Sequence, residues 1–236
     1  MKKFAVFDID GTLIRWQLYH AIVDKLAKNN LLGDNAHGQL KTARMAWKRR
    51  DNPEAFKAYE HTLITIYESA ITAIKPETFD ELVEEVVEEY KDQVYTFTRD
   101  LAIDLKKQGY FLVAISGSHH ELVTHIAHTY GFDDYIGTQY ERINGKFTGK
   151  KFVASKNKQS LLAYFVKKHG LTMHGSYAIG DSLLDESVLA MVEHPIAFNP
   201  DKQLYQEAKK QKWPIIIERK NVIYQLHYKD GHYTLV

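Results

Sequence analysis

Apolar runs alternate with amphipathic segments along most of the chain. The run KKFAVFDI, near the N-terminus, is continuous and rich in β-branched and aromatic residues, as strands buried on both faces of a parallel sheet are. The runs YFLVAISGS and SYAIGDS have the same character, and each follows a segment with helical periodicity. This alternation predicts an α/β fold, a Rossmann-like parallel sheet with helices on both of its faces.

Capping residues mark the ends of the predicted helices. The segment TRDLAIDLKKQG predicts a helix with Thr98 as its N-cap and Gly109 just past its C-terminus. Two later helices are predicted to end at Gly131 and Gly170, and DESVLAMVEH predicts a further helix. The short apolar runs PIAFNP and PIIIE predict edge strands or late strands of the same sheet.

Two segments interrupt this alternation. In YERINGKFTGK, the pair Asn144-Gly145 separates short alternating segments and predicts a β-hairpin. At least three helical patterns lie between residues 15 and 95, where a connection of about 4–6 residues would be usual. We therefore expect an inserted all-helical cap domain at 15–95 and an α/β core domain formed by 1–14 and 96–236. Because the insertion begins just after the first strand, we expect it to lie over the end of that strand.

The composition narrows the class of protein further. With 236 residues and 44% hydrophobic content, the chain is predicted to be globular rather than disordered or fibrous. Lys and Arg total 31 against 30 for Asp and Glu, so no basic field argues for a nucleic-acid partner. Without cysteine there is no disulfide, thiolate nucleophile or cysteine-containing zinc site. The N-terminus does not resemble a secretion signal and no run is long enough to span a bilayer, so we expect a cytoplasmic location and no membrane partner.

Polar residues gather where the predicted strands end. In an open parallel sheet, ligands bind beyond the carboxyl ends of the strands. The residues expected at or near that edge are Asp8, Asp10, Ser116, Gly117, Lys158, Asp181 and Asp185. Carboxylates that lie together raise one another's pKa unless a cation compensates, and Mg²⁺ prefers oxygen ligands of this kind. We predict that Asp8 and Asp181 bind Mg²⁺ together with the backbone carbonyl of Asp10. Ser116, nearby backbone N–H groups and Lys158 would then bind a phosphate dianion.

The order of these residues resembles the motifs of the haloacid dehalogenase-like superfamily of phosphohydrolases. FDIDGTLI resembles its first motif, AISGS its second, the lysine of NKQSLL its third and IGDSLLDESVL its fourth. The matched elements span nearly the whole chain outside the inserted helices. An insertion between the first two motifs is similar to that of the class IB branch, which includes phosphoserine phosphatase.

The resemblance implies a role for each matching position. Asp8 would be the nucleophile that becomes a transient aspartyl phosphate. Asp10 would protonate the leaving alkoxide and then activate water, and its place two residues along the strand lets it address the same substrate. Ser116, Gly117 and Lys158 would bind the phosphoryl oxygens.

The resulting hypothesis is a Mg²⁺-dependent phosphatase that acts on a small phosphorylated metabolite. Asp181 would hold the metal ion, and Asp185 would orient Lys158 or the water molecules of the metal. One alternative is phosphoserine phosphatase specifically. Gln17 is expected to contact the substrate, but phosphoserine phosphatases typically carry a glutamate there for the substrate ammonium, which weighs against phosphoserine. A phosphotransferase or a non-catalytic regulatory phosphoacceptor domain is a second alternative, and the oligomeric state stays open.

Four other patterns have simpler interpretations. GKFTGKK imitates a phosphate-binding loop with the wrong spacing, and we interpret it as part of the hairpin. The histidines of HELVTH are five residues apart and cannot share a helix face as a pair of zinc ligands would. KTARMAWKRR and ELVEEVVEEY are interpreted as a basic and an acidic surface helix of the insertion.

Overall fold

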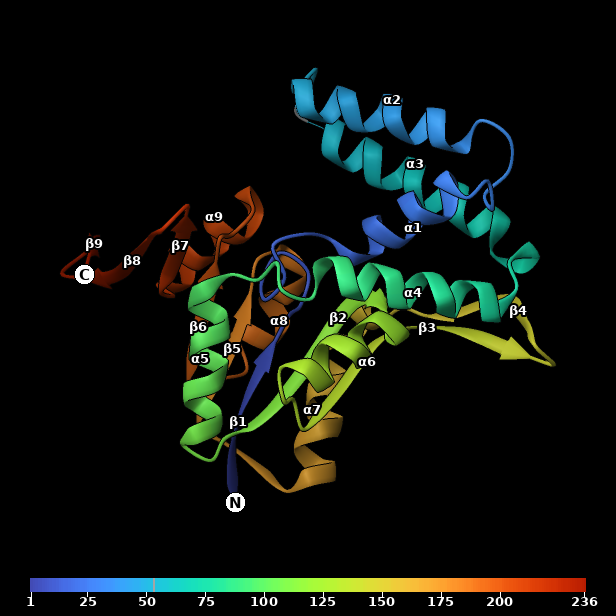
Figure 1. Ribbon diagram of the computed structural model, residues 1–236. Coiled ribbons are helices and arrows are strands. Elements are labelled where there is room, and N and C mark those ends of the chain that lie inside the picture. Colours follow the sequence, from blue (N-terminus) through green and yellow to red (C-terminus); the bar gives the residue numbers. More distant parts are fainter. Residues whose placement is uncertain (53) are drawn as a thin grey trace.

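A sheet crosses the whole molecule in the computed structural model, which describes residues 1–52 and 54–236 (Figure 1). In these residues the sheet has nine strands in the order β4-β3-β2-β1-β5-β6-β7-β8-β9. The strands are β1 (Lys2–Phe7), β2 (Phe111–His119), β3 (Asp134–Ile143), β4 (Lys146–Phe152), β5 (Leu171–Gly180), β6 (His194–Phe198), β7 (Ile215–Arg219), β8 (Val222–Lys229) and β9 (His232–Leu235). The central part, from β3 to β7, is parallel, and the outer pairs at both ends are antiparallel.

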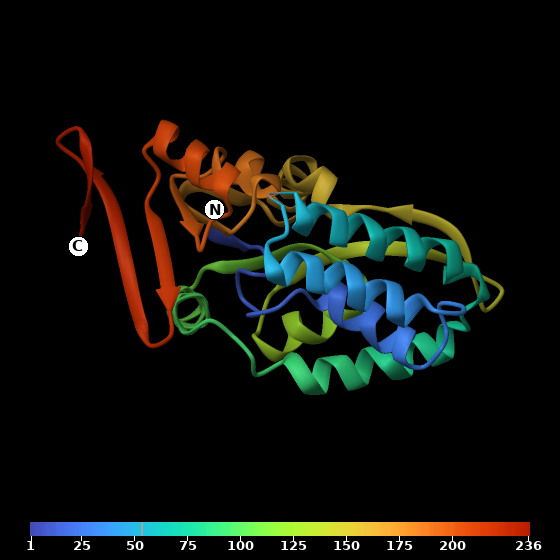
Figure 2. The same cartoon turned by 90° about the horizontal axis from the view of Figure 1, so that it is seen from above.

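The sheet buries alternate residues of β1 on its two faces. Phe4 and Val6 belong to a hydrophobic cluster with residues of the helices α7 (Lys158–His169), α8 (Glu186–Leu189) and α9 (Lys202–Gln211). Ala5 and Phe7 belong to a second cluster with residues of α5 (Thr96–Lys107) and α6 (His120–Thr129). Figure 2 shows these two sets of helices on opposite sides of the strands. The predicted α/β fold with helices on both faces is therefore confirmed.

Among the residues that the structure describes, four helices lie between β1 and α5 in the sequence, and we call them the cap helices. They are α1 (Leu18–Lys28), α2 (Ala36–Arg49), α3 (Ala55–Ala70) and α4 (Pro76–Tyr90), and the 3-10 turn η1 (Ile71–Ala73) follows α3. Figure 1 shows them above the upper ends of β1 and β2, with α2 and α3 outermost. The hydrophobic cluster that includes α5 and α6 continues into α1, α3 and α4. The division into a core and a cap domain at residues 15 and 95 stays a prediction.

The predicted hairpin joins the core to the cap helices. Asn144 and Gly145 form its turn, with φ of 50° and 71°, between the antiparallel strands β3 and β4. On β3, Arg142 donates two hydrogen bonds of 2.7 Å to Asp80 of α4. On β4, Lys151 pairs with a glutamate of α3. These ion pairs connect the hairpin to α3 and α4.

Three local predictions were wrong. Thr98 is not an N-cap, because α5 begins at Thr96 and the Thr98 hydroxyl donates to the carbonyl oxygen of Thr12 at 2.8 Å. The first N–H groups of α5 are instead bound by the Glu218 carboxylate of β7. The strand expected to stop at Ser116 and Gly117 continues to His119. The helix expected over DESVLAMVEH is reduced to η3 (Leu183–Asp185) and the short α8.

The C-terminal hairpin of β8 and β9 was not predicted. Its turn consists of Asp230 and Gly231, both with positive φ, which is a recognised hairpin signal. The sequence between residues 15 and 95 contains the expected basic and acidic surface helices, here α2 and α4. No helix within residues 1–52 and 54–236 is long and apolar enough to cross a bilayer.

Candidate active site

The predicted site residues come from four segments that meet at the carboxyl edge of the parallel strands. Asp8 and Asp10 follow β1, and the Asp8 N–H donates to the Ile179 carbonyl of β5 at 3.0 Å. Ser116 and Gly117 lie near the end of β2. Lys158 begins α7 after the 3-10 turn η2 (Ala154–Asn157), and Asp181 and Asp185 follow β5. The strand order places β1 between β2 and β5, so all four segments converge there.

Lys158 lies between two buried carboxylates. Its Nζ is 2.6 Å from Asp8 Oδ1 and 2.6 Å from Asp185 Oδ1, and only 4% of the residue is exposed. Burial lowers the pKa of Lys158, but Asp185 and Asp8 outweigh it, so the pKa lies above its ordinary value. The ammonium is therefore a fixed charge that sets the orientation of the Asp8 carboxylate. The second oxygen of Asp185 accepts hydrogen bonds from the backbone N–H and the hydroxyl of Ser182.

The carboxylates of Asp8, Asp181 and Asp185 form a cluster with more negative charge than Lys158 compensates. One oxygen from each lies within 4.8 Å of the others. Burial, opposed in part by Lys158 and reinforced by the neighbouring aspartates, raises the pKa of Asp8 to about 7. Burial and the nearby Asp8 likewise raise the pKa of Asp181 well above its ordinary value. Such a site is short of positive charge, which is what a divalent cation supplies.

The backbone next to this cluster is shaped for close approach. Gly11 has a φ of +78°, and a Cβ added there would lie 2.2 Å from Asp181 Oδ2. Only glycine tolerates both this conformation and this proximity. Thr12, which the sequence analysis did not assign, is buried beside Gly11, and its hydroxyl is 3.4 Å from Asp181 Oδ1. The donor set and the close backbone fit a Mg²⁺ ion held by Asp8 and Asp181. Because both Asp185 oxygens have other partners, Asp185 is placed to position Lys158.

Asp10 stands apart from this cluster of three acids. Its Oδ1 accepts a hydrogen bond of 2.6 Å from the backbone N–H of Leu18, the first residue of α1. Its Oδ2 accepts one of 2.8 Å from the Ser116 hydroxyl, whose oxygen in turn accepts from the Ser118 N–H. The Asp10 side chain is thus held by both the core and a cap helix. The part predicted for its backbone carbonyl in metal binding stays a prediction.

The two remaining predicted residues lie close by. The Gly117 carbonyl accepts a hydrogen bond of 2.8 Å from the Thr138 hydroxyl of β3. Gln17 directly precedes α1, and its Nε2 lies 3.3 Å from the position of a Cβ at Gly11. The structure thus brings Gln17 to the rim of the site without giving it a role.

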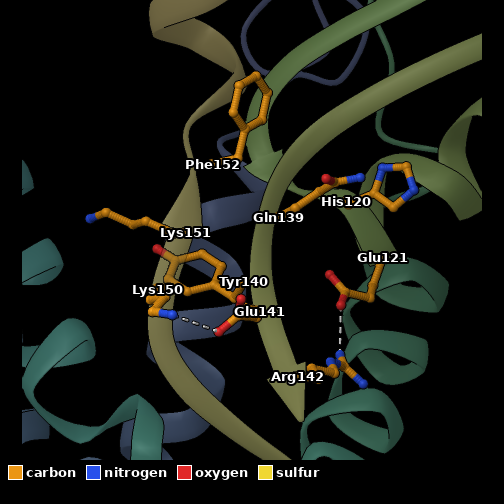
Figure 3. A pocket seen from close by; sticks show the side chains of 9 residues that line it. All are labelled: His120, Glu121, Gln139, Tyr140, Glu141, Arg142, Lys150, Lys151 and Phe152. Atoms are coloured by element: carbon orange, nitrogen blue, oxygen red, sulfur yellow. Dashed lines mark hydrogen bonds and ion pairs between the residues drawn. The ribbon is translucent and has the colours of Figure 1, made fainter.

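An open pocket on the hairpin side is separate from this site. It has a volume of about 550 Å³ and is lined from β3, β4 and the start of α6 (Figure 3). Its charged groups are already paired, since Arg142 binds Glu121 at 2.6 Å and Lys150 lies 3.8 Å from Glu141. None of its lining residues belongs to the acidic cluster. Neither the acidic cluster nor Ser116, Gly117 and Lys158 therefore line this pocket.

Residues 5–190 match the family model described as haloacid dehalogenase-like hydrolase. This chain belongs to that family. The predicted family membership is therefore confirmed, and the chain is an enzyme of the hydrolase class. A protein named histidinol-phosphatase from Neisseria meningitidis serogroup C (strain 8013) is 26% identical over 230 residues, covering 92% of this chain and 99% of the relative. A protein named phosphoserine phosphatase from Mycobacterium tuberculosis (strain ATCC 25618 / H37Rv) is 26% identical over 148 residues, covering 61% and 46%.

Solved structures have the same fold as this hydrolase. A protein of unknown function from Bordetella pertussis Tohama I superposes with a TM-score of 0.73 at 22% identity, covering 92% of this chain and 99% of the other. A phosphoserine phosphatase, solved as an analogue of its phospho-aspartyl intermediate, gives a TM-score of 0.65 at 22% identity, covering 93% and 94%. Both likenesses extend over the cap helices as well as the sheet.

Proposed function

We propose that this hydrolase is a Mg²⁺-dependent phosphatase that cleaves a small phosphate monoester through covalent phosphorylation of Asp8. The observation that carries the proposal is the buried contact of Asp8 with Lys158 beside Asp181, at the edge of the sheet where ligands bind. The phosphatase class is also supported by the family and by the names of the relatives.

The first half of the reaction transfers the phosphoryl group to the protein. The Asp8 carboxylate attacks phosphorus, the bond from phosphorus to the ester oxygen breaks, and Asp10 gives its proton to the leaving alkoxide. Lys158 holds Asp8 in the attacking orientation. When bound beside Asp8 and Asp181, Mg²⁺ supplies positive charge to the phosphoryl oxygens.

The second half releases phosphate. Asp10, now ionised, removes a proton from a water molecule, which attacks phosphorus and breaks the bond to Asp8. The hydrogen bond from Leu18 fixes Asp10 only while α1 is in place, so closure of the cap helices would orient the acid. Closure would also exclude bulk water from the acyl phosphate.

The substrate is proposed only as a class, small phosphorylated metabolites. Phosphoserine stays an alternative because phosphoserine phosphatases share the fold and one relative carries that name. The relative that matches over nearly the whole chain carries the name histidinol-phosphatase, so histidinol phosphate is a second substrate to test. The neutral amide of Gln17 would attract a substrate ammonium less than a carboxylate would.

The test is phosphate release from a panel of monoesters that includes phosphoserine, histidinol phosphate, phosphoethanolamine and sugar phosphates, with Mg²⁺ or with EDTA. We expect phosphate release in the presence of Mg²⁺, at a rate that falls by about 10³-fold or more in Asp8→Asn. Asp104 is an exposed aspartate of α5, so Asp104→Asn should release phosphate at the normal rate. Acid-quenched protein should carry phosphate on Asp8 by mass spectrometry. No release from any monoester, with Mg²⁺ bound, would reject hydrolysis and favour phosphotransfer or a regulatory phosphoacceptor.

A further inference from the structure

Aromatic rings gather between the cap helices and the end of β2. The imidazole of His119 lies nearly parallel to the rings of Tyr19 from α1 and Tyr140 from β3, with centroids 5.4 and 4.6 Å away. Tyr67 of α3 meets His119 edge-on at 5.2 Å, and Phe79 of α4 lies at 4.9 Å. The group therefore contains residues of the core and of three cap helices, and His119 is at its centre.

Several polar atoms in this group have no hydrogen-bond partner among the residues that the structure describes. They are both ring nitrogens of His119 and the Tyr67 hydroxyl. His119 and Tyr67 are both 0% exposed. Buried polar groups in native proteins are nearly always paired, because an unpaired one loses its bonds to water and gains none. Three such atoms on two residues in contact point to a polar ligand that is bound there in the working enzyme.

These atoms lie next to the proposed catalytic groups along two segments of the chain. Ser118 donates its N–H to the Ser116 hydroxyl, which binds Asp10. Tyr19 directly follows Leu18, whose N–H binds the other oxygen of Asp10. If Asp10 protonates the ester oxygen, the remainder of the substrate lies on the cap side of Asp10. The part of the substrate that leaves would therefore meet His119 and its neighbours.

The chemistry of the group favours an uncharged polar ligand. Burial and the positive charge of Arg142 lower the pKa of His119 to about 3, so its imidazole is neutral, with one N–H donor and one acceptor. The Arg142 guanidinium lies over the rings of Phe79 and Phe147 and is itself bound by Asp80 and Glu121, so the charged side chains beside the group are already paired with one another. The surrounding aromatic rings would solvate an anion poorly. A hydroxyl, an amide or a neutral azole can both donate and accept.

We infer that His119 and Tyr67 recognise the leaving group of the phosphate monoester, and that this leaving group carries an uncharged group that donates and accepts hydrogen bonds. The inference rests on the proposed phosphatase function and adds the selectivity of the same site. Tyr67 belongs to a cap helix and His119 to the core, so separation of the two exposes these atoms. Closure on a suitable substrate then gives them partners, and closure on an alkyl ester does not.

The first test compares propyl phosphate, glycerol 3-phosphate and phosphoethanolamine, which are similar in length, with the larger 2-(imidazol-4-yl)ethyl phosphate. We expect the wild-type enzyme to prefer the hydroxyl ester or the azole ester over both others by about 10-fold or more in kcat/KM. Tyr67→Phe and His119→Phe should each reduce that preference by about 10-fold. Tyr233→Phe is the matched control, because the Tyr233 hydroxyl already donates to the carbonyls of Ala208 and Trp213 and lies on the distant C-terminal hairpin.

The second readout is the thermal midpoint of the enzyme without substrate. Removing an unpaired buried hydroxyl should raise Tm, by about 2–4 °C in Tyr67→Phe, while Tyr233→Phe should lower it. The inference would be overturned, while the proposed function stands, if the wild-type enzyme is active and all variants share its substrate preference. A wild-type preference for propyl phosphate or phosphoethanolamine would have the same meaning. A lower Tm in Tyr67→Phe would do the same, since it would mean that the hydroxyl has a partner in the free enzyme. If wild type releases phosphate from no monoester, the proposed function fails, and this inference fails with it.

Discussion

Protonation of His119 should destabilise the protein in mild acid. The imidazole is fully buried, and burial together with the charge of Arg142 lowers its pKa from 6.5 to about 3. Below pH 6.5 the His119 imidazole binds a proton in the unfolded chain but stays neutral in the folded chain, so the free energy of unfolding falls as the pH falls. At pH 5, about 1.5 pH units below the ordinary pKa, the free energy of unfolding is lower than at neutral pH by about 2 kcal/mol, at about 1.36 kcal/mol per unit.

The assay is urea unfolding at pH 5 and pH 7.5, with EDTA present, for wild type, His119→Phe and His125→Phe. Removal of the buried imidazole should reduce the loss between the two pH values by about 2 kcal/mol. His125 is exposed on α6, and its replacement should leave the loss unchanged.

Other groups titrate over the same range, but they cancel in this comparison. Asp8, whose pKa is raised to about 7 by burial, works in the opposite direction, because the folded state binds its proton more tightly than the unfolded state. Since Asp8 is present in all three proteins, the difference between them reports His119. An equal loss of stability in wild type and His119→Phe would refute a neutral, desolvated imidazole at this position.

Three further predictions concern the acidic site. Lys158→Met should reduce the free energy of unfolding in urea by about 3–5 kcal/mol, because it leaves buried carboxylates without their cation. Lys168→Met breaks only a surface ion pair and should reduce it by about 1 kcal/mol or less. Equal losses in the two variants would contradict this prediction. Gly11→Ala should lower kcat/KM by about 100-fold, because the added Cβ displaces the Asp181 side chain. Gly33 has a similar φ but no atom within 4 Å of an added Cβ, so Gly33→Ala should keep normal turnover. Similar turnover in both variants would contradict the close approach of Asp181 to Gly11. Mg²⁺ at about 100 times its Kd should raise Tm by about 5–10 °C relative to the Tm measured in EDTA. A rise of the same size in Asp181→Asn would exclude Asp181 as a metal ligand.

The parallel part of the fold could be predicted because its strands are buried on both faces. Runs such as Phe4–Phe7 are continuous in apolar residues, and the helices between them end at glycines with positive φ, such as Gly109 and Gly170. The C-terminal hairpin lacks this signal. Strand β8 mixes Val222, Ile223 and Tyr224, all at least 40% exposed, with polar residues, so its apolar content does not mark a buried strand.

The end of a helix was harder to predict where a distant residue decides it. Thr98 is a good N-cap by residue type, but the Glu218 carboxylate, 122 positions from Thr96, already binds the N–H groups at the start of α5. The Thr98 hydroxyl is then free to bind the Thr12 carbonyl instead. Local propensity was overridden by a tertiary contact that no local pattern indicates.

The same reason explains why the sequence indicated the acidic residues but not His119, which we infer only from the structure to contact the substrate. Asp8, Asp10 and Asp181 lie at the ends of strands, where topology alone brings them together. His119 follows two serines and a glycine and precedes a second histidine, which is typical of a solvated turn. Its burial depends on rings from α1, α3 and β3, and therefore on how the cap helices sit.

Under the proposed roles of Asp10 and His119, the position of the cap helices would connect substrate choice with proton transfer. The first N–H of α1 holds Asp10, and the next residue along the same helix, Tyr19, stacks on His119. A leaving group that satisfies His119 would stabilise α1 in the closed position, which is also the position that orients the proposed acid. A leaving group without a polar group leaves these buried atoms unpaired, so closure is less favourable and Asp10 is less often in place. Discrimination would therefore affect kcat as well as KM, because the same helix carries both contacts.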